Sequence, residues 1–71
     1  MRFITIEPID GPPEAINPNY ISNIAIFNDD RGTYVGFFMA SGMLVRTKFT
    51  TIQHAVDYVQ RAPSVTLEEK Q

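Results

Sequence analysis

Three β-prone runs between residues 20 and 49 constrain the fold of this chain more than any other feature. Apolar and aromatic side chains fall on both faces of these runs, and polar or glycine-containing turns separate them. Such runs are typical of antiparallel strands joined by hairpins. We predict strands over residues 20–28, 33–40 and 43–49, with a polar loop at 28–32 and a two-residue turn at Ser41-Gly42.

A single helix is predicted after these strands. Thr50 and Gln53 have the spacing of a capping box, in which a hydroxyl precedes a glutamine by three residues. Apolar residues then recur with the period of one helical face. They are Ile52, Ala55, Val56 and Val59. Because Pro63 cannot continue a helix, we place the helix at about residues 51–62.

The N-terminal segment predicts a further short strand. Ile4 and Ile6 alternate with polar residues, and Pro8 ends the strand or places it at a sheet edge because proline has no backbone N–H to donate. Residues 14–16 could pair with it before a turn at Asn17-Pro18-Asn19.

The fold class expected from these elements is α+β. It consists of a small antiparallel β-meander of three to five strands, followed by one C-terminal helix packed on one sheet face. We expect residues 1–63 to form a single domain and residues 64–71 to form a flexible tail, in which Val65 and Leu67 could anchor part of the chain.

Composition excludes several classes of function. The 71 residues include no cysteine and one histidine, which argues against disulfides, thiolate metal sites and zinc, so we expect no cofactor. A net charge of −2 argues against electrostatic capture of nucleic acid. The chain has no apolar run of roughly 18 residues and no signal-peptide pattern, so we expect a cytoplasmic protein without membrane contact.

The predicted register distributes the apolar side chains over two faces. With a two-residue turn at Ser41-Gly42, Phe38 lies opposite Val45. In the first hairpin, Asn28 opposite Thr33 puts Phe27 beside Tyr34 and Ile24 beside Phe37. One face then comprises Ala25, Phe27, Tyr34, Phe38, Met43, Val45 and Phe49. We assign the helix to this face, because Phe49 leads directly into it. A slip of one residue in either hairpin would change both faces.

The second face is the predicted partner-binding site. It comprises Ile24, Ile26, Val35, Phe37, Met39 and Leu44, with Arg46 and Lys48 at its margin. Leaving such groups in water forgoes roughly 1.5–3 kcal/mol for each side chain, and monomers rarely expose so large a patch. We therefore expect a homo-oligomer or a larger protein partner on this face. The alternative is that the N-terminal strand or the tail covers it.

Catalytic and metal sites are less well supported by the sequence. His54 is the only histidine, but its helical position points away from the apolar stripe, so we expect no enzyme activity. Asp29 and Asp30 lack the ligand spacing of a calcium loop and are typical of a hairpin loop. Gly36, within a strand, suggests the close approach of a ring or of backbone.

The order of features from Ala15 to Val59 resembles the small FlbD/SwrD-like proteins associated with bacterial flagella. The matching segments are residues 16–21 (Ile-Asn-Pro-Asn-Tyr-Ile), 24–26, 41–45 and 51–59. The resemblance implies a small non-enzymatic regulator or assembly factor. Residues 10–13 and the run at 37–39 depart from the family pattern.

The leading hypothesis is a non-catalytic interaction module that self-associates or binds a larger protein, as a regulator, inhibitor or assembly factor. A phage- or plasmid-encoded inhibitor and a bacterial accessory factor fit equally well. The alternative is single-stranded nucleic-acid binding on an aromatic sheet face, where Tyr34, Phe37 and Phe38 stack bases and Arg31, Arg46 and Lys48 bind phosphates.

Overall fold

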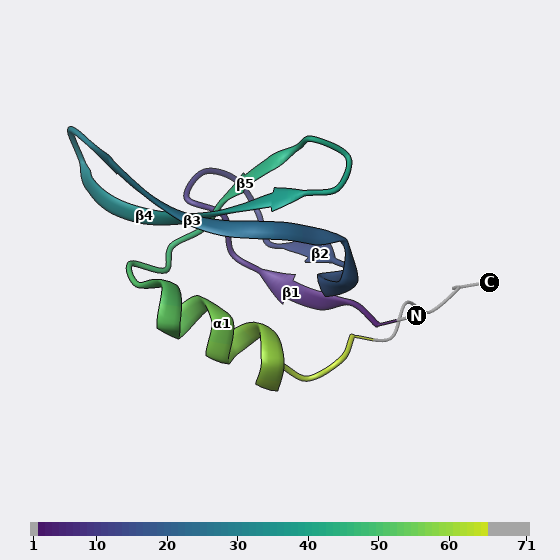
Figure 1. Cartoon of the computed structure of the whole chain (residues 1–71). Helices are drawn as coiled ribbons and strands as arrows, with labels where there is room; N and C mark the ends of the chain where they lie inside the picture. Colours follow the sequence, from purple (N-terminus) through teal and green to yellow (C-terminus); the bar gives the residue numbers. More distant parts are fainter. Residues whose placement is uncertain (1, 66–71) are drawn as a thin grey trace.

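The computed structural model describes residues 2–65 and confirms the α+β prediction (Figure 1). A three-stranded antiparallel sheet has the order β3-β4-β5, and a two-stranded antiparallel sheet pairs β1 with β2. The strands are β1 (Ile4–Ile6), β2 (Glu14–Ile16), β3 (Ile21–Asp29), β4 (Gly32–Met39) and β5 (Leu44–Arg46). A short 3₁₀ helix, η1 (Pro18–Tyr20), precedes β3, and the helix α1 (Ile52–Arg61) follows β5.

The hairpin between β3 and β4 has the register that the sequence predicts. Asn28 pairs with Thr33, Phe27 with Tyr34, and Ile24 with Phe37. The loop closes between Asp29 and Gly32, so only two residues connect the strands. Asp29 Oδ1 accepts a hydrogen bond of 2.8 Å from the Arg31 N–H, which fixes the turn.

The hairpin between β4 and β5 differs from the predicted one by a single residue. Met39 donates its N–H to Met43 O at 2.9 Å, so the loop contains the three residues Ala40, Ser41 and Gly42. Gly42 has a φ of 96°, the positive value that a three-residue hairpin loop requires at its last position. Phe37 therefore pairs with Val45. The prediction that Phe38 lies opposite Val45 is wrong.

The N-terminal segment joins the two sheets. Pro8 forms an antiparallel bridge with Thr47, and Ile9 donates its N–H to Arg46 O at 2.8 Å. Thr47 is fully buried, and its hydroxyl donates to Val35 O at 2.8 Å. β1 is thereby held across the inner face of the larger sheet, on the same side as α1 (Figure 1).

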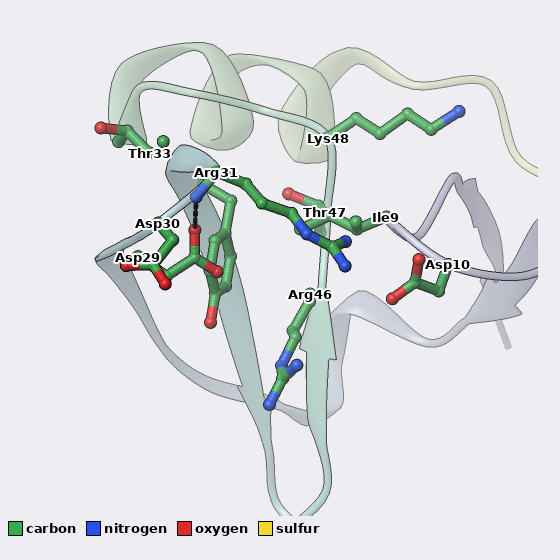
Figure 2. Close-up of a pocket in the computed structure, with 11 residues that line it drawn as sticks. Ile9, Asp10, Asp29, Asp30, Arg31, Thr33, Arg46, Thr47 and Lys48 are labelled. Atoms are coloured by element: carbon green, nitrogen blue, oxygen red, sulfur yellow. Dashed lines mark hydrogen bonds between the residues drawn. The ribbon is translucent and has the colours of Figure 1, made fainter.

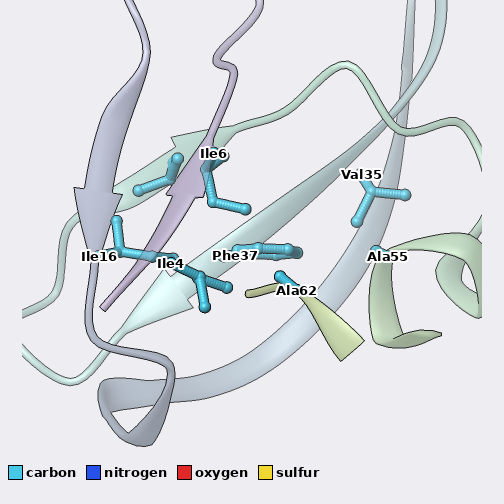
Figure 3. Close-up of a cluster of buried hydrophobic side chains, with 8 residues drawn as sticks. Ile4, Ile6, Ile16, Val35, Phe37, Ala55 and Ala62 are labelled. Carbon is cyan, nitrogen blue, oxygen red and sulfur yellow. The ribbon is translucent and has the colours of Figure 1, made fainter. Parts of the chain in front are cut away.

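The core lies between this inner face and a layer that β1, β2 and α1 form together (Figure 3). Its buried apolar residues are Ile4, Ile6, Ile16, Val35, Phe37, Val45, Ala55 and Ala62. Val35 and Phe37 from the sheet are 0% exposed. A single helix is too small to cover the sheet, and the N-terminal strands supply the remaining cover.

The helix is capped at both ends. Thr51 is the N-cap, and its side chain accepts the His54 N–H at 3.2 Å; the prediction of a capping box that starts at Thr50 is therefore one residue early. At the other end the guanidinium group of Arg2 donates to Ala62 O at 2.8 Å and to Val59 O at 3.2 Å. This cation satisfies carbonyl groups at the helix C-terminus and binds the helix to the start of β1.

The C-terminal segment continues along the N-terminal strand as far as it is described. Val65 donates its N–H to Phe3 O at 2.8 Å, as expected for an anchor. Leu67 and the rest of the predicted tail, residues 66–71, lie outside the described residues. Within the part of the chain that the structure describes, no helix has the length and apolar character needed to cross a membrane.

Candidate functional site

The predicted partner-binding patch does not form as an exposed face. Val35 and Phe37, at its centre, are buried in the core against Ile4 and Ala55. The helix lies on this face, so the assignment of the helix to the opposite face is wrong. The alternative stated from the sequence, that the N-terminal strand covers this face, is what the structure shows.

The other residues of the predicted patch are distributed over several environments. Ile24 and Met39 are half-buried and pack against the core, while Ile26 is 43% exposed. Leu44 lies opposite Phe38, and Arg46 lies opposite Gly36, so both belong to the outer face of the sheet. The exposed side chain of Lys48 forms an ion pair of 3.8 Å with Glu7.

The outer face of the larger sheet carries an aromatic cluster instead. We define the outer aromatic cluster as Phe27, Tyr34, Phe38 and Leu44, all half-buried. Phe27 and Tyr34 are stacked, with ring centroids 5.3 Å apart, and Phe27 and Phe38 are tilted at 5.9 Å. Among residues 2–65, no helix or strand covers this face (Figure 1).

Gly36 permits the close packing of this cluster. A Cβ atom at this position would lie 2.8 Å from the Phe27 ring and 2.8 Å from Leu44 Cδ1. A strand residue with no side chain therefore lets the ring of Phe27 rest on the backbone of β4, which confirms the prediction made from a glycine within a strand. Gly36 therefore lies beneath the side chains of Phe27 and Leu44 in the outer aromatic cluster.

Replacement of Gly36 by alanine is expected to displace the Phe27 ring and lower the free energy of unfolding by about 1–2 kcal/mol, because the added methyl group overpacks the site. Urea denaturation measures the loss. The same change in a Phe27→Leu background should cost less, since a smaller side chain meets the methyl group. Equal losses in both backgrounds would show that the contact with the Phe27 ring does not cause the destabilisation.

A charged groove borders the aromatic cluster at Tyr34 and Arg46 (Figure 2). It has a volume of about 590 Å³ and lies between the tip of the β3–β4 hairpin, the end of β5 and residues 9–10. Its charged side chains are Asp10, Asp29, Asp30, Arg31, Arg46 and Lys48. Arg31 extends from the hairpin tip across the groove, whereas Lys48 points away from it (Figure 2). Equal numbers of acids and bases give the groove no single sign of charge.

The single histidine and the hydroxyl groups near it in the sequence have structural roles or lie apart from this groove. His54 is exposed on α1, and the hydroxyl of Thr51 is occupied as the helix cap. Ser41 Oγ accepts the Met43 N–H at 3.4 Å within the hairpin loop. In the described range, 2–65, no three His, Cys, Asp or Glu side chains gather in a way that could hold a metal ion.

The sequence interpretation placed the candidate surface on the wrong face because the second hairpin was shifted by one residue. The aromatic residues of the outer cluster were visible in the sequence, but they were assigned to the helix-covered side. Gly36 was a signal that could have helped to locate the cluster, since a glycine within a strand suggests the close approach of a ring or of backbone. Comparison with protein-family models, curated proteins and solved structures finds no match for the chain.

Proposed function

We propose that this protein is a non-catalytic interaction module that binds a larger protein through the outer aromatic cluster, as a small regulator, inhibitor or assembly factor. The observation that supports the proposal is an aromatic surface that no other described element covers. Aromatic side chains of this kind contribute most of the binding energy at many protein interfaces.

The composition of the surface suits a protein partner. Phe27, Tyr34 and Phe38 present apolar area, while Arg46 and the charged groove form a polar rim beside them. An apolar centre with a polar rim is the usual anatomy of a specific interface. The half-buried state of the rings fixes them before binding, which reduces the entropy lost on association.

The resemblance to FlbD/SwrD-like flagellar proteins supports the same class of function. It rests on the short strand and Asn17-Pro18 corner, the strands and the terminal helix, and it implies regulation or assembly rather than catalysis. Under this proposal the task of the fold is to present the sheet face.

Site-specific photocrosslinking tests the proposal. A benzoylphenylalanine at Tyr34 should crosslink a defined partner in cells, and the same group at the exposed Gln60 on α1 should not. Phe38→Lys should reduce the Tyr34 crosslink by about 30-fold or more, because the loss of an aromatic anchor costs about 2 kcal/mol or more. Identical products from positions 34 and 60, or crosslinking that survives Phe38→Lys, would contradict the proposal.

A second candidate is single-stranded nucleic-acid binding on the same face. Tyr34 and Arg46 lie together at the groove, so a base could stack beside a phosphate contact. Fluorescence polarisation with mixed-sequence oligonucleotides at low salt tests this function, and the affinity must fall steeply as salt increases. The three aspartates of the groove oppose it electrostatically.

A further inference from the structure

The free edge of β3 has backbone groups that no described residue satisfies. β3 is the outermost strand in the order β3-β4-β5, and it is nine residues long. Within residues 2–65, no backbone hydrogen bond reaches Ile24, Ile26 or Asn28 from outside the β3–β4 pair. The edge is therefore available to another strand.

The hydrogen bonds of β4 show which groups of β3 point outward. Val35 uses both of its backbone groups on the side away from β3: its N–H donates to Phe49 O at 2.9 Å, and its C=O accepts the Thr47 N–H at 2.9 Å. Ile26, directly opposite Val35, is therefore not hydrogen-bonded to β4. Since this pattern alternates along an antiparallel pair, the N–H and C=O groups of Ile24, Ile26 and Asn28 all point to the free edge.

The edge also lacks the features that normally prevent strand addition. Residues 21–29 (Ile-Ser-Asn-Ile-Ala-Ile-Phe-Asn-Asp) contain no lysine, arginine or proline, and the one irregularity lies at the start, between Ile21 and Asn23. Ile26 is 43% exposed there. A nine-residue edge without basic residues or proline favours pairing with another strand.

We propose that β3 pairs antiparallel with β3 of a second copy of this chain, about a two-fold axis through Ile26. This register places Ile26 opposite Ile26 of the second copy and Ile24 opposite its Asn28, so all outward backbone groups are paired without entering the irregularity. On the outer face the small Ala25 lies opposite Phe27 of the second copy, which leaves room for the ring. Residues 24–28 carry no charge, and Asp29 lies opposite Asn23 of the second copy, so no like charges meet in this register.

This inference goes beyond the proposed function: it takes up the self-association expected from the sequence and assigns it to a different surface, the strand edge. The two outer aromatic clusters would lie on one continuous six-stranded sheet, both on the same face. Oligomerisation is also a common means by which a chain of this size gains stability.

Paired charge variants test both the dimer and its register. The wild-type chain should have twice the 8.0 kDa mass of one chain in light scattering at micromolar to millimolar concentration. Ile26→Lys and Ile26→Glu should each be monomeric, with dissociation constants raised by about 100-fold or more, because like charges meet at the axis. An equimolar mixture of the two should form a heterodimer, since lysine then faces glutamate.

Two controls make the result specific. Met43→Lys changes a side chain that is 61% exposed but distant from β3, and it should remain dimeric. Far-ultraviolet circular dichroism should show that all variants are folded. Amide exchange should be slow at Ile24, Ile26 and Asn28 only in the dimer, and slow at Ala25 and Phe27 in every variant.

A wild-type chain that is monomeric throughout the concentration range would overturn the inference, as would Ile26 variants that stay dimeric or fail to pair with each other. None of these outcomes would affect the crosslinking result at Tyr34. The experiments therefore distinguish a failure of the proposed β3–β3 dimer from a failure of the proposed partner binding at the outer aromatic cluster.

Discussion

Phe37→Ala is expected to remove most of the stability of the protein at room temperature. The ring is 0% exposed and lies between the sheet and the layer of β1, β2 and α1. Loss of such a ring costs about 3–5 kcal/mol, through the lost transfer free energy and the cavity that remains. Small domains have total stabilities near the lower end of about 5–15 kcal/mol, so little would remain. Urea denaturation followed by circular dichroism measures the change.

Phe38→Ala is the matched control for this experiment. Phe38 is the next residue in the same strand, but it lies on the outer face and is only half-buried. We expect it to lose clearly less stability than Phe37→Ala. A larger loss from Phe38→Ala, or a folded Phe37→Ala variant with nearly full stability, would show that the inner face has been assigned incorrectly.

Ile4→Ala should have the second largest effect, a loss of about 2–4 kcal/mol. Ile4 is fully buried and packs with Phe37 in the core, although only three residues of β1 are in a regular strand. Ile26→Ala removes the same atoms from a side chain that is 43% exposed, and it should cost less than about 1 kcal/mol in the monomer. Chemical denaturation, at a concentration where the chain is monomeric, measures the loss in the free energy of unfolding for each variant.

Equal losses from Ile4→Ala and Ile26→Ala would contradict the role given to β1. In that case the N-terminal strand would lie on the sheet without forming part of the core, and the inner face would be open to a partner after all. The comparison therefore tests the cover of the inner face independently of any binding experiment.

Most elements of the fold could be predicted from local patterns. The first hairpin was recognisable because Asp29 to Gly32 allow few alternatives, and the helix because its apolar spacing ends at Pro63. The second hairpin was not determined in this way. Ala40-Ser41-Gly42 is compatible with a two-residue or a three-residue loop, because either one can use the positive φ of Gly42.

The difference of one residue in the length of this loop decided where the candidate site was predicted. In the observed register Val45 joins Phe37 inside the core, and Leu44 joins Phe38 outside it. A slip by one position exchanges the two faces of a strand, so Leu44 and Arg46 lie on the outer face instead of in the predicted patch. Phe49, which was used to place the helix, packs against the core and Tyr58 on the inner face. The cover that β1 provides depends on contacts between residues far apart in sequence, which periodicity cannot reveal.

The contacts between the two ends of the described chain have a consequence for biosynthesis. Arg2 binds carbonyl groups of Val59 and Ala62, and the Tyr58 hydroxyl donates to Thr5 O. Residues near Arg2 thus find these partners 53–60 residues later along the chain. We expect a nascent chain halted before the helix emerges to remain protease-sensitive, because contacts of such high sequence separation can form only after the helix has been synthesised.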